Sequence, residues 1–292
     1  MNRLKFRTSL FSALLSCCVF TASLANAQPN PPAGWVTPFP AFRVIGPLYG
    51  VGMRDLSVFL ITSDEGHILI NTGLEDSTEA IRQNIESLGF RLEDVRILLT
   101  MQAHWDHTAA MAEIKQIADA EVWATEKDAR VLQDGGFSDA HFGGRESFAP
   151  VAVERILKQD EIIALGDLRI TVHEHPGHTE GSSSYSFQVS EADRSYDVVI
   201  ANMGTVNGGK RLVIDPTYSG VAVDFATTYN KQKQMDVDVW VSAHASHYNM
   251  HEKYTPGQPY SPDTFVDPTG YIKAIERLET AYLEVIADEL DQ

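Results

Sequence analysis

Cysteine is almost missing from this chain of 292 residues, which has only Cys17 and Cys18. Both lie within the first 27 residues, so the rest of the chain has no thiol for a disulfide or for a metal-thiolate site. The chain also lacks a Gly-x-Ser-x-Gly sequence, which carries the nucleophile of many serine hydrolases. Disulfide scaffolds, thiolate metal sites and this type of serine hydrolase are therefore disfavoured.

Basic residues are scarce as well. Lys and Arg number 23 against 40 Asp and Glu, which gives a formal net charge of −17. Three of the basic residues, Arg3, Lys5 and Arg7, belong to the first 27 residues, which contain no acid, so their removal takes the charge from −17 to −20. Such a surface repels phosphate, and we expect neither nucleic acid nor an anionic membrane as a partner. The acidity favours solubility and says nothing about a substrate.

Long hydrophobic runs are absent too, and the apolar segment 9–20 is too short to span a bilayer. It follows the basic start and precedes Ala25-Asn26-Ala27, which has the form of a signal-peptidase site. We expect residues 1–27 to be a signal peptide that is cleaved after Ala27, which implies a periplasmic protein. Lipidation at Cys17 is an alternative, because Leu14-Leu15-Ser16-Cys17 resembles a lipobox.

The remaining residues, 28–292, are enough to bury a core without disulfides. They suit one large domain or two fused repeats, and no linker divides them. Apolar runs, caps and turns predict alternating strands and helices, which indicates a layered α/β architecture. His67, just after the turn of a predicted hairpin, is interpreted as a surface residue. The predicted strands are 58–62, 67–70, 95–100, 121–124, 168–175, 185–189, 198–201 and 237–242, and the helices are 77–89, 108–117, 126–132 and 271–290.

A cluster of metal-binding residue types follows the predicted strand 95–100. Gln102, His104, Asp106 and His107 all fall within six positions. Imidazole nitrogen and carboxylate oxygen are common ligands of zinc. On a strand-to-helix turn, Gln102 and His104 project towards one point, whereas Asp106 and His107 project towards a second point nearby. A single His is more often structural, but this density favours a site for two metal ions.

Two later strand ends carry further histidines. His178 lies in Pro176-Gly177-His178-Thr179, and His244 follows the predicted strand 237–242. The other histidines of these regions are interpreted as strand, surface or loop residues: His173, His175, His247 and His251.

The segment from Gln102 to His107, after a buried strand, resembles the first metal motif of the metallo-β-lactamase superfamily, and Pro-Gly-His-Thr resembles the second. Gln102 stands where a leading His is usual, and this replacement is similar to GOB-type members of subclass B3. The resemblance covers nearly the whole of residues 28–292. It implies one metallo-β-lactamase domain with an αββα sandwich.

The resemblance also implies two Zn²⁺ ions per chain, held in two sets of three ligands. An amide oxygen is a weaker zinc donor than an imidazole, so the site with Gln102 is predicted to be the weaker one. The first set would be Gln102, His104 and His178, and the second Asp106, His107 and His244.

The implied activity is hydrolysis of the β-lactam ring amide by a metal-bound hydroxide, and hence antibiotic resistance. Asp106 would orient the water or a proton. Ser183, Met203 and Thr205 are the expected contacts to a small-molecule β-lactam, and we expect a monomer.

Two alternatives differ in class. Another hydrolase of the superfamily would act on a lactone, a thioester or a phosphodiester. Such relatives place a metal-bridging Asp at a strand end where this chain has Asn202 and Met203, which favours the β-lactamase. The other alternative is a non-catalytic binding protein, in which Gln102 marks a decayed site. The Gly-rich stretch 134–144 contains His141-Phe142-Gly143 and resembles a loop at the active-site mouth of subclass B3 enzymes.

Overall fold

The computed structural model describes residues 30–191 and 193–291. The predicted signal peptide, its cleavage site after Ala27 and Cys17 lie outside these residues. From Pro32 onward the described chain forms one compact unit. No helix among the described residues has the length and apolar character needed to cross a membrane.

The first sheet has seven strands in the order β1-β2-β3-β4-β5-β6-β7. Strands β1 to β4 pair antiparallel, and β4 to β7 pair parallel. The predicted hairpin is confirmed as β3 and β4, joined at the turn before Gly66. The bounds are β1 Phe42–Ile45, β2 Leu48–Gly50, β3 Phe59–Ser63, β4 Gly66–Ile70, β5 Val95–Leu99, β6 Glu121–Thr125 and β7 Arg155–Leu157.

The second sheet has five strands in the order β12-β11-β10-β9-β8. Only β11 and β12 pair parallel within it; the other neighbours pair antiparallel. The bounds are β8 Ile162–Leu165, β9 Leu168–Glu174, β10 Ser183–Glu191, β11 Arg194–Ala201 and β12 Val239–Ser242.

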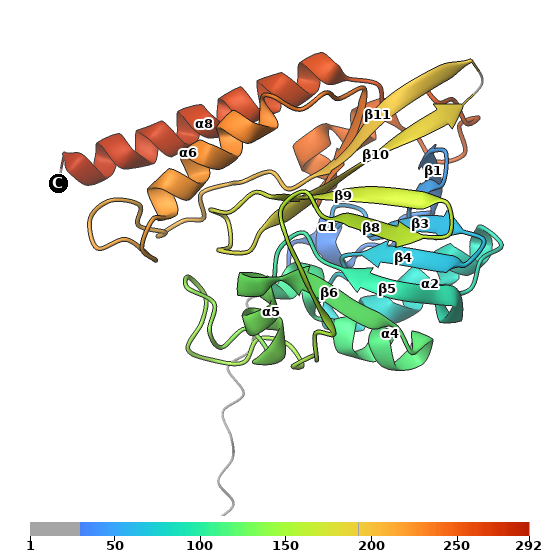
Figure 1. The fold of residues 1–292 in the computed structure, drawn as a ribbon, viewed down its shortest axis with the longest axis horizontal. Coiled ribbons are helices and arrows are strands. Elements are labelled where there is room, and N and C mark those ends of the chain that lie inside the picture. Colours follow the sequence, from blue (N-terminus) through green and yellow to red (C-terminus); the bar gives the residue numbers. More distant parts are fainter. Residues whose placement is uncertain (1–29, 192, 292) are drawn as a thin grey trace, which may run out of the picture. The chain divides into compact units, whose positions relative to one another are not determined.

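Helices cover the outer face of each sheet, so the layers are helix, sheet, sheet, helix (Figure 1). Helices α2, α4 and α5 pack on the first sheet, and helices α6 and α8 pack on the second. The predicted αββα sandwich is confirmed. The helices are α1 Ala33–Val36, α2 Thr78–Ser87, α3 Trp105–Thr108, α4 Met111–Ala118, α5 Glu126–Gln133, α6 Val221–Gln232, α7 Met250–Lys253 and α8 Pro268–Leu290.

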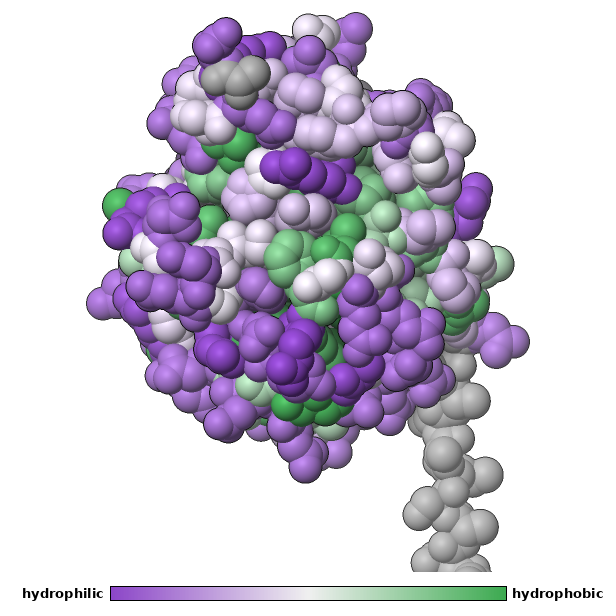
Figure 2. All heavy atoms as spheres, turned by 90° about the vertical axis from the view of Figure 1, so that its right-hand side faces the viewer, coloured by the Kyte–Doolittle hydropathy of each residue, from purple (hydrophilic) through white to green (hydrophobic). Residues whose placement is uncertain are grey.

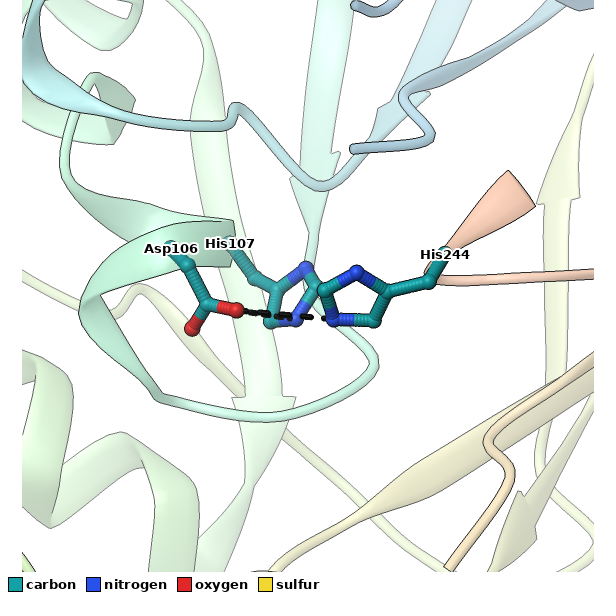
Figure 3. A group of neighbouring side chains, drawn as sticks. All are labelled: Asp106, His107 and His244. Atoms are coloured by element: carbon teal, nitrogen blue, oxygen red, sulfur yellow. Dashed lines mark ion pairs between the residues drawn. The ribbon is translucent and has the colours of Figure 1, made fainter. Parts of the chain in front are cut away.

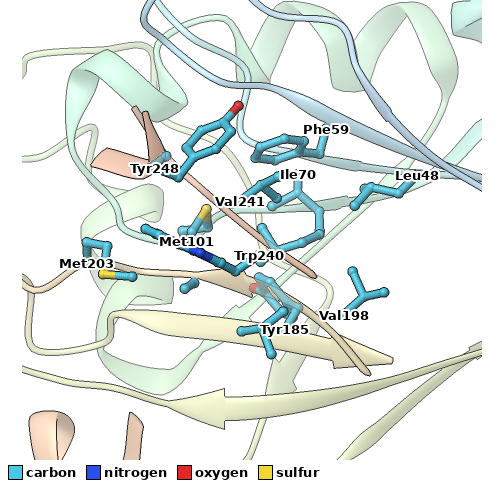
Figure 4. Close-up of a cluster of buried hydrophobic side chains, with 14 of the residues drawn as sticks. Leu48, Phe59, Ile70, Met101, Tyr185, Val198, Met203, Trp240, Val241 and Tyr248 are labelled. Atoms are coloured by element: carbon cyan, nitrogen blue, oxygen red, sulfur yellow. The ribbon is translucent and has the colours of Figure 1, made fainter. Parts of the chain in front are cut away.

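The central strand β4 of the first sheet is buried on both faces. In β4, Ile68 and Ile70 join the core between the sheets, whereas Leu69 joins the core under the helices. This alternation follows from the two-residue period of a strand. Figure 4 shows part of the core between the sheets, where Phe59 and Ile70 of the first sheet lie near Val241 of β12. Each such side chain contributes roughly 1.5–3 kcal/mol by leaving water.

His67 shows where the sequence interpretation is wrong. It is only 7% exposed, because β4 is a central strand with helices on its outer face. Its ring meets Phe90 edge-on, with the centroids 5.1 Å apart. Burial lowers the pKa of His67, so a neutral imidazole takes the place of an apolar side chain here.

The closing helix α8 begins as its sequence suggests. Asp267 is the N-cap and accepts a hydrogen bond from the Gly270 backbone N–H at 2.8 Å, and Pro268 occupies the first turn.

Figure 2 shows one face of the molecule, and the surface of that face is mainly hydrophilic. This agrees with the excess of acidic residues in the sequence.

Candidate metal centre

A cleft of about 180 Å³ opens where several strands end. The turn after β5, the loop after β9, the loop after β11 and the segment after β12 all supply side chains to it. The carboxyl ends of β5, β11 and β12 therefore converge with the end of β9. The cleft is lined by Trp35, Gln102, His104, Trp105, Asp106, Phe142, His178, Met203, Thr205, Asn207, His244 and His247.

Asp106, His107 and His244 form the tightest cluster of metal-binding groups (Figure 3). One ligand atom from each lies within 4.8 Å of the others. The Asp106 Oδ2 atom is 3.1 Å from His107 Nε2 and 3.5 Å from His244 Nε2. The sequence separates His244 from the other two by more than 130 positions, and the parallel pairing of β11 with β12 helps to bring its strand end to the cleft.

His104 and His178 form the second pair of imidazoles in the cleft. Their ring centroids lie 4.8 Å apart at an interplanar angle of 65°. Gln102 lies beside them in the lining, and its side-chain amide makes no hydrogen bond within the described chain. The structure thus brings the six predicted ligands to one place, five in the lining and His107 directly behind Asp106.

Three histidines of the cleft also approach an oxygen atom of a neighbouring residue. His178 Nδ1 is 2.8 Å from the Thr205 carbonyl oxygen, which accepts its proton. His244 Nδ1 is 3.3 Å from Asp55 Oδ2, and His104 Nε2 is 3.5 Å from Asp139 Oδ2. Contacts of this kind fix ring orientation and tautomer, which leaves the other ring nitrogen free to bind a metal.

The charges in the cleft follow from burial and from these contacts. Burial lowers the pKa of His107 and takes that of His178 well below its usual value, so both rings are neutral at pH 7. Burial raises the pKa of Asp106, but His107 and His244 outweigh it and hold that pKa well below its usual value. Burial lowers the pKa of His244, but Asp106 and Asp55 outweigh it and raise that pKa to about 9.

A cation fits this donor set. His107 is completely buried, yet neither of its ring nitrogens has a hydrogen-bond partner in the described chain. Its approach to Asp106 lacks the geometry of a hydrogen bond. Buried polar atoms without partners are costly. A metal ion bound by lone pairs of the cluster would remove this cost.

Comparisons with known proteins agree with this geometry. A family model described as the metallo-β-lactamase superfamily matches residues 52–191. The chain is 43% identical to the class B3 di-zinc metallo-β-lactamase LRA-12 from an Alaskan soil metagenome, with 88% of this chain and 98% of that one covered and a TM-score of 0.85. The chain belongs to the metallo-β-lactamase superfamily.

Two further relatives mark the range of the similarity. The metallo-β-lactamase GOB-18 from Elizabethkingia meningoseptica is 39% identical, with 92% of this chain and 100% of that one covered and a TM-score of 0.87. A hydroxyacylglutathione hydrolase from a Bradyrhizobium strain is 28% identical over 50% of this chain. The alignment spans only about half of that hydrolase, 52% of its length. Among solved structures, this superfamily member is closely similar to class B3 metallo-β-lactamases.

The expected substrate contacts fall into two groups. Met203 and Thr205 line the cleft of this superfamily member. Ser183 does not, because it is only 2% exposed and its hydroxyl donates a hydrogen bond to the Thr100 carbonyl at 3.3 Å. The structure therefore does not bring Ser183 to the place where a substrate would bind.

The end of β11 supplies no carboxylate to the cleft. The Asn202 amide nitrogen donates a hydrogen bond to the Met101 carbonyl at 2.8 Å, which ties β11 to the turn after β5. The next residue, Met203, presents a thioether to the cleft. Among the residues that the structure describes, Asp106 is the only carboxylate in the lining.

Sequence reasoning missed several residues of the site. Trp35 comes from the Pro-rich segment before the first strand, lies 5.4 Å from the His244 ring and donates its indole N–H to Asp55 at 3.2 Å. His247 was interpreted as a loop residue, but it lines the cleft and its ring lies 4.9 Å from that of His244. Phe142 comes from the Gly-rich loop, and its ring meets His104 at 5.1 Å.

Only two of these residues had a signal in the sequence. His247 lies three positions after His244. Phe142 belongs to the Gly-rich stretch 134–144, which resembles a loop of subclass B3 enzymes. Nothing in the local pattern around Trp35 or Asp55 pointed to the cleft.

Proposed function

We propose that this protein is a zinc-dependent β-lactamase that hydrolyses the ring amide of β-lactam antibiotics. The observation that carries the proposal is the cleft itself, in which the cluster of Asp106, His107 and His244 faces the pair of His104 and His178. The similarity of the whole chain to class B3 enzymes supports the same conclusion.

The two groups of side chains suit two zinc ions. Gln102, His104 and His178 would hold the first, as a variant of a three-His site, and Asp106, His107 and His244 would hold the second. Zinc bound in such a cleft supplies two kinds of chemistry, since it makes water acidic near neutral pH and polarises a carbonyl group. Neutral imidazoles and an ionised carboxylate are the protonation states that zinc needs in its ligands.

The residues of the chain itself position the reaction. Asp106 is ionised at pH 7, and its carboxylate can accept a proton of the attacking water and so orient it. Trp35, Phe142 and Met203 provide apolar walls for the body of a β-lactam. Thr205 and Asn207 provide neutral hydrogen-bond donors for its carboxylate.

Two features argue against other substrates of the superfamily. The end of β11 brings Asn202 and Met203 rather than a carboxylate to this region. The cleft lining of the described chain also contains no Lys or Arg, which a phosphodiester site would use to hold its charge.

The test is a substrate panel with the purified zinc-loaded protein: a carbapenem, a cephalosporin, a penicillin, an acyl-homoserine lactone and a hydroxyacyl-glutathione thioester. We expect β-lactam turnover that a chelator abolishes, with much slower turnover of the lactone and the thioester. His178→Ala and His244→Ala should lose this turnover, whereas Glu126→Gln, an exposed change far from the cleft lining, should keep it. Faster hydrolysis of the lactone or the thioester would refute the proposal.

Location and assembly complete the proposal. Residues 1–27 would direct export, so that the periplasmic protein begins at Gln28, and the enzyme would act as a monomer. N-terminal sequencing of the exported protein and its mass in solution test these two points.

A further inference from the structure

A buried carboxylate lies between the two loops that carry the predicted ligands of the first zinc. Asp128 belongs to α5, whose N-cap Thr125 ends β6, and it is only 2% exposed. It does not line the cleft. Its position is therefore not explained by contact with a substrate.

The Asp128 carboxylate accepts three hydrogen bonds, and all three come from these two loops. Its Oδ2 atom accepts the Ala103 backbone N–H at 2.9 Å, between Gln102 and His104. The same oxygen accepts the Thr179 hydroxyl at 3.1 Å, one residue after His178. Its Oδ1 atom accepts the Gly181 backbone N–H at 3.1 Å.

The contact between α5 and the second loop is unusually close. Thr125 donates its hydroxyl to the Gly181 carbonyl at 2.6 Å. A Cβ atom on Gly181 would collide with the Asp128 backbone nitrogen and with the Thr125 hydroxyl, so a glycine is required for this approach. The loop after β9 is thus held against the start of α5 by backbone and side-chain contacts together.

We infer that Asp128 is a positioning residue for the first metal site, where its carboxylate sets the distance between the loop of Gln102 and His104 and the loop of His178. The inference rests on the metal assignment of the proposed function. The second cluster consists of Asp106, His107 and His244, and none of these side chains hydrogen-bonds to the Asp128 carboxylate within the described chain. Its affinity for zinc should therefore not depend on this carboxylate.

Asp128→Asn is the discriminating change, since an amide keeps the shape but presents an N–H₂ group to at least one of the three donors. Zinc affinity is measured by chelator competition in two backgrounds. His244→Ala leaves only the first site intact, and His178→Ala leaves only the second. We expect Asp128→Asn to weaken zinc binding about 10–100-fold in the first background, as changes to outer contacts of metal ligands do. In the second background we expect no change.

Glu126→Gln is the matched control, because it makes the same carboxylate-to-amide change at an exposed position of the same helix. It should alter neither affinity. Equal weakening of both sites by Asp128→Asn, or no weakening of the first, would overturn the inference.

Amide hydrogen exchange in the zinc-free full-length protein is a second measurement that needs neither metal nor substrate. Asp128→Asn should speed exchange at the Ala103 or the Gly181 amide, whichever of the two faces the new N–H₂ group and loses its acceptor, and should leave residues 243–247 unchanged. Unchanged exchange at both amides would overturn the inference. Because this readout is independent of catalysis, a failure of the proposed β-lactamase activity would be seen separately, in the substrate panel.

Discussion

Replacing Asp55 by Asn should weaken the second zinc site in a way that depends on pH. The Asp55 carboxylate lies behind His244, with Oδ2 3.3 Å from His244 Nδ1. It also accepts the Trp35 indole N–H at 3.2 Å and the Ser246 backbone N–H at 2.9 Å. Asp55 therefore both orients the His244 ring and stabilises a positive charge on it.

The size of the effect follows from the pKa of His244. Burial lowers this pKa, but Asp106 and Asp55 together raise it from 6.5 to about 9. That shift corresponds to about 3.4 kcal/mol. Two carboxylates share the effect, so Asp55→Asn should remove roughly half and lower the pKa of His244 by about one unit.

Protons and zinc compete for His244 in the metal-free protein. Below pH 9 the ring is protonated, and zinc must displace that proton, so affinity rises with pH until the pKa is passed. In Asp55→Asn the zinc affinity should stop rising at a pH about one unit lower than in the parent protein. At pH 9 the variant should bind zinc about 10–100-fold more weakly, because the ring has lost an orienting partner. The ratio between the zinc affinities of the parent and the variant should fall about fivefold from pH 9 to pH 7, because proton competition weakens the parent about 50-fold over this range and the variant about tenfold.

The assay is chelator competition between pH 6.5 and 9.5 in the His178→Ala background, which isolates the second site. Asp76→Asn, at an exposed position that is not part of the cleft lining, is the control and should follow the parent protein at every pH. A gap between Asp55→Asn and its parent that is constant across this range would refute the reasoning.

Three further predictions concern the first site, the folded state and the substrate. Gln102→His should tighten zinc in the His244→Ala background, since an imidazole is a better zinc donor than an amide, and equal affinities would contradict this. Burial raises the pKa of Asp128 from 3.8 to about 6. The folded state therefore holds its proton longer than the unfolded state, and the free energy of unfolding of the zinc-free protein should fall, relative to Asp128→Asn, by about 3 kcal/mol as pH rises through this window. Urea unfolding at pH 4 and pH 7 measures the free energy of unfolding of both proteins. A difference between the parent and Asp128→Asn that is the same at both pH values would contradict the prediction. Finally, Ser183→Ala should leave KM for a β-lactam unchanged, because the Ser183 hydroxyl is engaged by Thr100, whereas Thr205→Ala should raise KM; equal effects in steady-state kinetics would contradict the assignment.

The metal motif was predictable because it depends on local rules. A buried strand followed by Gln102, His104, Asp106 and His107 fixes where these side chains project, and the strand period requires no knowledge of distant parts of the chain. The strand ends before His178 and His244 carried the same kind of signal. The alternation of strands and helices predicted a layered α/β architecture, and the resemblance to the superfamily implied the αββα order of the layers.

The rest of the site depends on contacts between segments that are far apart in the sequence. Trp35 and Asp55 meet His244 only because the segment 35–57 folds across the end of β12, where Ser57 N–H donates to the Ala243 carbonyl. No local pattern encodes that contact. Helix α6 was missed because its segment mixes β-branched, aromatic and polar residues and has no side-chain N-cap.

The sequence interpretation placed His67 at the surface and Ser183 in contact with the substrate, but both side chains are buried. The reason is related. A strand covered on both faces has no polar side, so position in the alternation does not reveal exposure. His67 is accordingly buried against Phe90, and the Ser183 hydroxyl is directed to a backbone carbonyl.

Zinc back-titration with simultaneous measurement of carbapenem hydrolysis tests the central claim most directly. The chelator-stripped protein should be inactive, should take up two zinc ions per chain and should recover turnover as they bind. A protein that takes up no more than one zinc ion and hydrolyses no β-lactam, at any zinc concentration that keeps it folded, would contradict the account.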